Sequence, residues 1–450
     1  MRKLAIALSV VGSIAALSVA SVGAAGAAET QAPVAGAFAQ LESEAITRGT
    51  TRAIVELKAN PSDGVANRSQ ANGVQQDLGN GGRIVRTVDN TNLAAVNVSA
   101  TGLAALRRSS HVKQVLPDDL VAPQLTQTVA LTGAQTAWIG GFDGTGQVVA
   151  VLDTGIDRTH PFLKDKVIDE ACFSSGYTGT GGCPNNQTTQ TGAGAAAPCK
   201  AAGCEHGTHV AGISAGRSGV QGAPTAGIAR GARVLAVQVF SVFPAGWGGC
   251  FTACPLAYTS DIIAALNYVK DRKLALPIAA ANLSLGGGSS ATKCGKTAYE
   301  KPIAGLKSAG VAVVIASGNE ANSNGISYPA CSPSAISVGA TNKQDQVETW
   351  YSNVSPYLTL LAPGSSVVSS IPGGGYAAMT GTSMATPHAA GAYAILRQRF
   401  GASLSVDQLT AKLTSTGKKI TDRRNGTAYP RIDLAKATGV PATKAKTAGK

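Results

Sequence analysis

Four runs of almost uninterrupted apolar residues most constrain what this chain can fold into. They occupy residues 147–152, 232–239, 279–285 and 311–316. Segments with amphipathic helical spacing alternate with them or follow them, at 260–270, 301–309 and 387–400. Strands that are apolar on both faces are typical of a parallel sheet, because helices cover such a sheet on both sides. The alternation therefore predicts an α/β fold with a mainly parallel central sheet.

The first 28 residues carry the pattern of a secretory signal. Arg2 and Lys3 precede an apolar run over 4–22, and Ala25-Gly26-Ala27 offers a small-residue cleavage site. The alternative, a transmembrane anchor, is disfavoured because the run is alanine-rich and weakly hydrophobic. We therefore expect a signal peptide over 1–28 and a secreted, extracellular protein that leaves the membrane once the signal is removed.

The cysteines agree with export. The chain has eight, an even number, and all of them follow residue 170. In an oxidising compartment such a set usually forms disulfides, although eight cysteines allow roughly a hundred pairings. The simplest prediction pairs neighbours along the chain, namely 172–183, 199–204, 250–254 and 294–331.

Composition excludes several classes of protein. With 44% hydrophobic and 14% charged residues, the chain can bury a sizeable core, so wholesale disorder is excluded. The net charge is +13, but the basic residues are scattered and only 5% of residues are aromatic. A nucleic-acid-binding protein would concentrate that charge in one patch, so we expect no nucleic-acid partner.

Three further regions follow the signal. Residues 29–125 predict a small α+β domain, with strands at 52–57, 83–88, 93–98 and 112–116 and a helix at 101–109 capped by Thr101. Residues 126–438 hold the predicted parallel sheet, a helix that begins after a Ser260 cap, and two cysteine-rich insertions at 172–204 and 241–258. The tail, 439–450, has no pattern and is expected to be disordered.

Asp153 ends the first apolar strand, in the string A-V-L-D-T-G-I. A carboxylate at the carboxyl edge of an open α/β sheet lies where such folds place their sites. It can also be a buried turn-capping residue. The third interpretation, an aspartic protease, needs two carboxylates that share a proton, and no second D-[ST]-G string occurs.

His206 opens the string H-G-T-H-V-A-G, where histidine can act as a base near neutral pH. A zinc site would use Cys204, His206 and His209. No second cluster of ligands accompanies them, and thiols of an exported chain tend to oxidise, so we expect no catalytic metal.

Ser383 lies in G-T-S-M-A-T-P-H, just before an apolar helical pattern. Pro387 is tolerated in the first turn of a helix, which places Ser383 at or near the helix N-terminus. Backbone N–H groups there point at developing negative charge. Alone, Ser383 could be a plain N-cap.

Together, Asp153, His206 and Ser383 supply a nucleophile, a base and a group that orients the base. Their order and flanking strings resemble the subtilisin-like serine proteases, or subtilases, over about residues 132–437. The resemblance implies a subtilisin-like three-layer α/β domain. It also implies that Ser383 is the nucleophile, His206 the general base, and Asp153 the orienting carboxylate, which leaves His209 structural.

The same resemblance implies the residues around the reaction. Asn319, in V-I-A-S-G-N-E, corresponds to the amide donor of the oxyanion hole. The expected walls of the pocket for the residue before the scissile bond (P1) are Ser284, Leu285, Gly286, Ala316, Ser317 and Gly318. These residues are small or apolar, so we expect broad specificity with an apolar or aromatic P1 residue. No cluster of Asp or Glu borders these segments in the sequence, which argues against specificity for paired basic residues.

Residues 29–125 then resemble the family's inhibitory pro-domain, a βαββαβ unit, and imply a zymogen that cuts itself between Asp119 and Thr128. The expected partners are polypeptide substrates and the chain's own pro-domain, and the enzyme is expected to be a monomer. No cofactor is required; calcium sites are frequent in the family, but no matching ligand loop is found. The alternative is a non-catalytic exported binding protein on the same scaffold.

Overall fold

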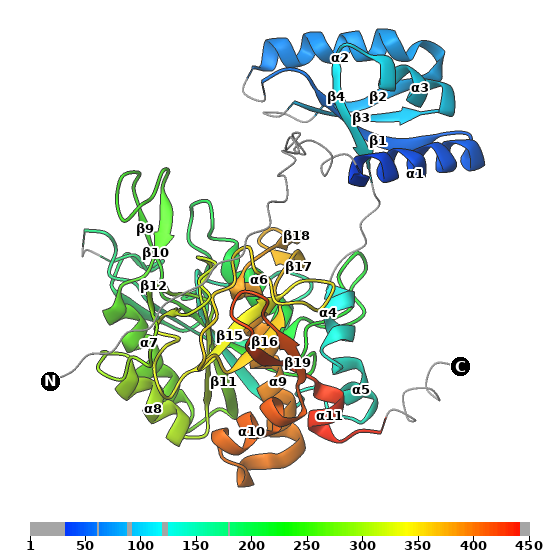
Figure 1. Ribbon diagram of the computed structural model, residues 1–450. Helices are drawn as coiled ribbons and strands as arrows, with labels where there is room; N and C mark the ends of the chain where they lie inside the picture. The colour runs from blue at the N-terminus through cyan, green and yellow to red at the C-terminus, as the bar shows by residue number, and fades with distance from the viewer. Residues whose placement is uncertain (1–31, 61–62, 88–91, 119–124, 179–180, 442–450) are drawn as a thin grey trace, which may run out of the picture. The chain divides into compact units, whose positions relative to one another are not determined.

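The computed structural model describes residues 32–60, 63–87, 92–118, 125–178 and 181–441. The predicted signal peptide, residues 119–124 of the predicted processing segment and residues 442–450 of the predicted tail lie outside the described residues. The chain divides into two compact units, Met1–Val121 and Ala122–Lys450, each with its own core (Figure 1).

The first unit is a four-stranded antiparallel sheet with helices packed on it. Its elements are α1 (Ala32–Arg48), β1 (Thr51–Leu57), α2 (Gly64–Leu78), β2 (Gly82–Thr87), β3 (Leu93–Val98), α3 (Ala100–Arg108) and β4 (Val112–Pro117), with the strand order β2-β3-β1-β4. The sequence pattern did not predict α1. The cap of α3 is Ser99, whose hydroxyl accepts the Gly102 N–H at 3.3 Å, and not Thr101 as predicted, because the helix begins one residue earlier.

The second unit is a three-layer α/β domain, as predicted, built on a ten-stranded sheet in the order β19-β20-β16-β15-β13-β11-β5-β8-β6-β7. Neighbours from β20 to β6 are parallel, and the two edge pairings are antiparallel. The strands are β5 (Val148–Asp153), β6 (Val167–Phe173), β7 (Thr189–Thr191), β8 (Arg233–Gln238), β11 (Ile278–Leu283), β13 (Ala312–Ala316), β15 (Ile336–Thr341), β16 (Leu360–Pro363), β19 (Lys418–Thr421) and β20 (Ala428–Arg431).

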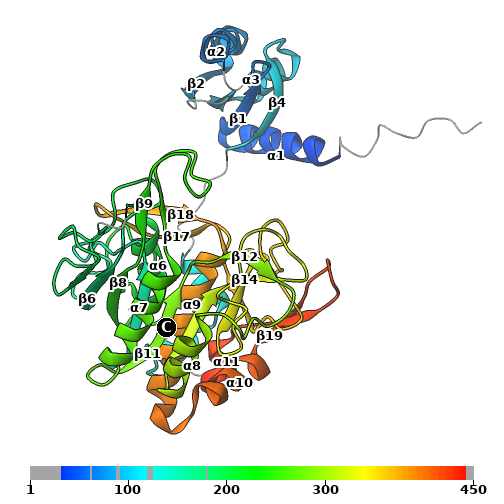
Figure 2. The ribbon, with the colours of Figure 1, turned by 90° about the vertical axis from the view of Figure 1, so that its left-hand side faces the viewer.

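Helices cover both faces of this sheet (Figure 2). The helices are α4 (Leu125–Leu131), α5 (Ala134–Ile139), α6 (His206–Ala215), α7 (Thr259–Arg272), α8 (Glu300–Ser308), α9 (Thr382–Phe400), α10 (Val406–Thr416) and α11 (Leu434–Thr438). Along β5, Val149 and Val151 belong to the core shared with α6 and α9, whereas Ala150 and Leu152 belong to the core shared with α7 and α8. The alternation explains why the whole strand is apolar, since each face meets a helical layer.

Three two-stranded ribbons complete the domain: β9 (Ser241–Phe243) with β10 (Cys254–Leu256), β12 (Gly287–Ser290) with β14 (Ile326–Tyr328), and β17 (Val367–Ile371) with β18 (Gly375–Met379). All eight cysteines pair as neighbours along the chain, which confirms the predicted bridges Cys172–Cys183, Cys199–Cys204, Cys250–Cys254 and Cys294–Cys331. The bridges close loops of the two predicted insertions and tie the segment after β12 to the segment after β14.

Two predicted helix starts were wrong. Helix α7 begins at Thr259, so Ser260 is inside it and does not cap it. The Thr259 hydroxyl instead hydrogen-bonds with the Tyr299 hydroxyl at 2.8 Å, a contact with a distant segment that the local pattern does not reveal. Helix α9 begins at Thr382, five residues before the predicted start, so Pro387 lies beyond its first turn.

Candidate active site

The three predicted catalytic residues come from elements that meet at one edge of the sheet. Asp153 is the last residue of β5, His206 is the first residue of α6, and Ser383 is the second residue of α9. Helices α6 and α9 pack against each other, and both contact β5. Ligands bind outside the carboxyl ends of the strands in open α/β sheets, and β5 delivers Asp153 to that edge.

Asp153 and His206 form a close pair. The Nδ1 atom of His206 lies 2.7 Å from Oδ1 of Asp153, and the Thr154 N–H donates to the same oxygen at 2.8 Å. The Asp153 side chain is 1% exposed and that of His206 is 24% exposed. A carboxylate that accepts the Nδ1–H proton leaves Nε2 as the basic nitrogen of the ring. The partner of Asp153 is thus a histidine and not the second carboxyl that an aspartic protease needs.

The charges around His206 favour its protonated form. Burial lowers the pKa of the imidazole and is the largest single effect. The charge and hydrogen bond of Asp153, together with the charge of Glu205, outweigh it, so the pKa of His206 is raised above its ordinary value. A base with a raised pKa binds the proton of a nucleophile more readily.

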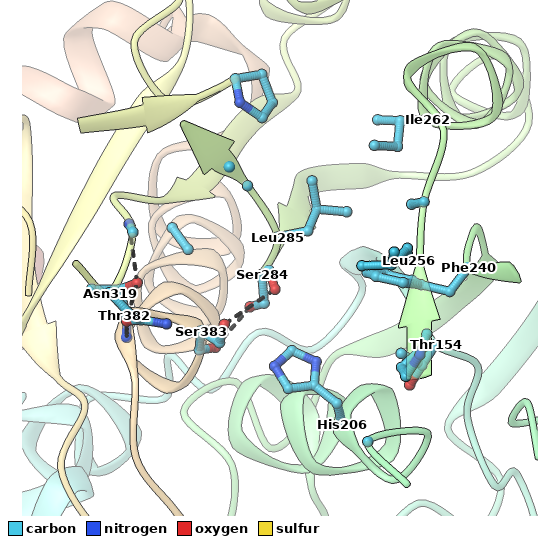
Figure 3. A pocket seen from close by; sticks show the side chains of 18 of the residues that line it. Thr154, His206, Phe240, Leu256, Ile262, Ser284, Leu285, Asn319, Thr382 and Ser383 are labelled. Carbon is cyan, nitrogen blue, oxygen red and sulfur yellow. Dashed lines mark hydrogen bonds between the residues drawn. The ribbon is translucent and has the colours of Figure 1, made fainter. Parts of the chain in front are cut away.

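Ser383 lines the same cavity as His206 (Figure 3). Its hydroxyl donates to the Ser284 carbonyl at 3.2 Å. Within the described part of the chain, no hydrogen bond joins the Ser383 hydroxyl to His206. Such catalytic hydrogen bonds are often loose without substrate and tighten when substrate binds.

Asn319 is held with its amide donor free. Its Oδ1 atom accepts the Thr382 N–H and the Thr382 hydroxyl, each at 2.9 Å (Figure 3). Among the residues that the structure describes, none accepts a hydrogen bond from Nδ2. A Cβ atom placed on Gly381 would lie 3.4 Å from that Nδ2 and 3.7 Å from the Ser383 nitrogen. The two N–H donors therefore flank one small space, which a side chain at residue 381 would obstruct. Such a space suits a developing oxyanion.

Most of the predicted substrate-binding residues line the cavity, which has a volume of about 930 Å³. Its lining includes Ser284, Leu285, Gly286, Ala316 and Gly318. Ser317 is not part of the lining: its side chain is buried, and its hydroxyl donates to the Asn353 carbonyl at 2.7 Å. Alternation along an extended chain explains the difference, because the side chain between two cavity-facing residues points away.

The cavity wall beyond Ser284 is apolar, and part of it comes from the second cysteine-rich insertion. Leu256 from β10 and Phe240 just before β9 face Ile262 of α7 across this region (Figure 3). The bridge between Cys250 and Cys254 closes the β9–β10 loop. The cysteine spacing marked this segment as a pinned loop, but nothing in its sequence indicated that it borders the site.

Sequence reasoning missed four polar residues of the site. Thr154 and Thr382 orient Asp153 and Asn319, and both threonines stand next to catalytic strings, which was the available signal. Glu205 and Glu320 also line the cavity, although no acidic cluster is visible in the sequence. They come from different segments, since Glu205 directly precedes α6 and Glu320 follows β13. One Glu320 oxygen accepts the Asn353 amide at 2.5 Å, so that carboxylate is partly occupied.

The zinc interpretation does not fit the structure. Cys204 is bonded to Cys199, and Nε2 of the buried His209 contacts the Ala377 carbonyl at 2.9 Å. In the described ranges, no group of three or more His, Cys, Asp or Glu residues is arranged to hold a metal ion.

In the same ranges, no helix is both long and apolar enough to cross a bilayer.

Comparisons with known proteins agree on one family. The model of the subtilase family matches residues 144–433. Subtilisin NAT of Bacillus subtilis subsp. natto is 31% identical over 355 residues, which cover 77% of this chain and 78% of that protein. An alkaline protease of Shouchella clausii is 34% identical over 291 residues, 64% of each chain. The crystal structure of a cold adapted subtilisin-like serine proteinase, 29% identical, covers 65% of this chain and 90% of its own, with a TM-score of 0.49.

Proposed function

This chain belongs to the subtilase family of serine peptidases, and from that premise we propose that it is a secreted endopeptidase with the triad Asp153, His206 and Ser383. The observation that carries the proposal is the 2.7 Å contact between the imidazole of His206 and the buried carboxylate of Asp153, in a cavity that Ser383 and Asn319 also line. A nucleophile, an oriented base and free amide donors in one cavity are what acyl transfer requires.

In the proposed mechanism, His206 takes the hydroxyl proton of Ser383 as this oxygen attacks the substrate carbonyl. Asp153 stabilises the resulting imidazolium but stays ionised. The tetrahedral oxyanion accepts hydrogen bonds from Asn319 Nδ2 and the Ser383 N–H. His206 then gives its proton to the amine nitrogen as the C–N bond breaks, which leaves an acyl-enzyme. In the second half, His206 takes a proton from a water molecule that attacks the acyl carbon. It returns this proton to Ser383 as the ester bond breaks and the acid is released.

We infer broad specificity with an apolar or aromatic P1 residue. The support is the small side of the cavity at Ala316 and Gly318 and its apolar extension at Phe240 and Leu256. An extended substrate can add main-chain hydrogen bonds beside residues 284–286, while its side chains enter these spaces. Matched peptides with Phe, Leu, Lys or Glu at P1 test this: kcat/KM should be highest for Phe and Leu. A higher kcat/KM for Lys would mean that the carboxylate of Glu320 dominates the choice of the P1 residue.

The N-terminal unit is proposed to be the inhibitory pro-domain of a secreted zymogen. Its compact fold around a core of its own supports this, as do the four disulfides of the second unit, because disulfides form in oxidising compartments. Processing is proposed between Asp119 and Thr128. The purified pro-domain should inhibit the mature enzyme, and a lack of inhibition would contradict this role.

The deciding experiment compares the wild type, Ser383→Ala and a control, Ser403→Ala. Ser403 is exposed, and its hydroxyl donates to the Phe400 carbonyl at 2.9 Å. Each is secreted and followed by intact mass and casein hydrolysis, with and without a serine-directed sulfonyl fluoride. The wild type and Ser403→Ala should lose the N-terminal unit, cleave casein and be inhibited. Ser383→Ala should do none of these. If Ser383→Ala matures and cleaves, the proposed nucleophile is wrong; a wild type that binds peptides without cleaving them would be a non-catalytic binding protein.

A further inference from the structure

Thr154 connects the two partners of the catalytic pair. Its N–H donates to Asp153 Oδ1 at 2.8 Å, and its hydroxyl accepts the Gly207 N–H at 2.9 Å. Gly207 directly follows His206 in α6. The side chain of Thr154 is buried although it borders the cavity, which limits the access of water to these contacts. The distance between the end of β5 and the start of α6 therefore depends on how Thr154 is held.

Two cysteines hold Thr154 from opposite ends of one short loop. The Cys199 N–H donates to the Thr154 carbonyl at 3.0 Å, and the Thr154 hydroxyl donates to the Cys204 carbonyl at 3.0 Å. Cys199 and Cys204 are bonded to each other, five residues apart. The disulfide thus closes a ring of contacts around Thr154.

Much of this loop is open to solvent. Lys200 and Ala202 are exposed, whereas Cys204 is buried. Its hydrogen bonds include the Cys204 N–H to the Ala201 carbonyl at 3.1 Å, and the Gly203 N–H to the carboxylate of Glu205 at 3.0 Å. Loops with few buried apolar contacts open easily unless they are tied. In this loop the disulfide therefore supplies a constraint that buried apolar side chains supply elsewhere.

We propose that the Cys199–Cys204 disulfide is a positioning element of the catalytic pair, which acts through Thr154 to keep the Asp153 carboxylate against the His206 imidazole. This inference rests on the proposed triad. The predicted walls of the P1 pocket come from the segments that follow β11 and β13. Of the bridged loop, the residue that lines the cavity is Gly203, which carries no side chain. Loss of the bridge should therefore lower kcat and leave KM nearly unchanged.

The test compares two double variants of the mature enzyme. Cys199→Ala with Cys204→Ala removes the bridge beside Thr154, and Cys172→Ala with Cys183→Ala removes a bridge of the same insertion that lines no part of the cavity. The control bridge spans 11 residues instead of five, so its loss should cost at least as much stability. The two variants therefore separate positioning from stability.

For the first variant we expect kcat to fall about tenfold or more, because small misplacements of catalytic groups have effects of this size. KM should stay within about twofold of wild type, and the acidic limb of the kcat profile should move to lower pH, since a looser Asp153 raises the pKa of His206 less. The control should melt at a lower temperature than wild type and keep its kcat and pH profile. Equal kcat for the first variant and wild type, or losses in both variants that follow their melting temperatures, would overturn the proposal.

A second pair of variants keeps the question answerable if the first double variant does not fold. Thr154→Val removes the hydroxyl that links Cys204 to Gly207, and Thr154→Ser keeps it. We expect Val to reproduce the loss of kcat and the pH shift, and Ser to restore both. If Val and Ser behave alike, the linkage through Thr154 is wrong. Casein cleavage by Ser383→Ala would instead refute the proposed triad, so the two failures are distinguishable.

Discussion

The hydroxyl of Ser284 donates a 2.7 Å hydrogen bond to the main-chain carbonyl of Ser383 (Figure 3). Helix α9 cannot use this carbonyl, because the residue four positions on is Pro387, which has no N–H. The segment after β11, which is proposed to bind substrate, therefore satisfies the main-chain carbonyl of the proposed nucleophile, and the hydrogen bond joins these two parts of the site.

This hydrogen bond predicts the effect of Ser284→Ala. The variant leaves the Ser383 carbonyl without a donor, which should lower the free energy of unfolding by about 1–3 kcal/mol and reduce kcat/KM. Pro387→Ala restores an N–H within reach of that carbonyl. In a double-mutant cycle, Pro387→Ala should therefore recover part of the stability lost in Ser284→Ala. The free energies of unfolding are measured with urea in a Ser383→Ala background. If the effects of the two substitutions on this free energy are strictly additive, the proposed link between Ser284 and the Ser383 carbonyl is wrong.

Asn319→Leu should remove one of the two oxyanion donors. We expect kcat to fall by roughly 10²–10³ with little change in KM, a magnitude known from a subtilisin, which is a relative of this chain. Thr382→Val should act in the same direction but more weakly, because it removes one of the two bonds that orient Asn319. Steady-state kinetics on one peptide decide this. A change in KM alone would mean that Asn319 only binds substrate.

Glu205 predicts a shift in the pH profile. The titratable groups that shift the pKa of His206 are Asp153 and Glu205, and the charge of Glu205 raises it. The base must be neutral, so activity falls as the pH drops through that pKa. Glu205→Gln should therefore move the acidic limb of kcat/KM to lower pH, most clearly at low salt. If the acidic limb of Glu205→Gln lies at the same pH as that of the wild type, the charge of Glu205 does not affect the pKa of His206.

Two buried histidines predict acid sensitivity. Burial lowers the pKa of both His209 and His388 to about 4. A lowered pKa means that the folded state resists protonation, so the stabilisation is complete above the unfolded value near 6.5 and is lost as the pH falls from there through about 4. Each group should contribute a slope of about 1.4 kcal/mol per pH unit in that window.

Urea unfolding of Ser383→Ala between pH 7 and pH 4 measures this slope without self-digestion. His388→Gln removes one titrating group and should flatten the curve, whatever its effect on stability at pH 7. His111→Gln is the matched control, because His111 lies in the N-terminal unit, outside the domain that unfolds with α9. If His388→Gln and wild type lose stability in parallel, His388 is not the source of the sensitivity.

Local patterns determined much of this protein. The apolar runs that end at Asp153 and Ala316 predicted strands of a parallel sheet, because burial on both faces leaves no polar positions. The strings around His206 and Ser383 predicted the proposed chemistry. The spacing of the cysteines did not determine their pairing, but the simplest prediction, that neighbours along the chain pair, is confirmed for all four bridges. These features depend on residues close together in the chain.

Only the tertiary structure decided which groups meet across the chain. Thr154 bonds Cys204 and Gly207, and Ser284 bonds Ser383, because β5, β11, α6 and α9 converge at one edge of the sheet. Glu205 and Glu320, from different segments, line one cavity for the same reason. Whether two residues form a hydrogen bond or line the same cavity depends on the distance between them in the folded chain. Their separation along the sequence does not give that distance.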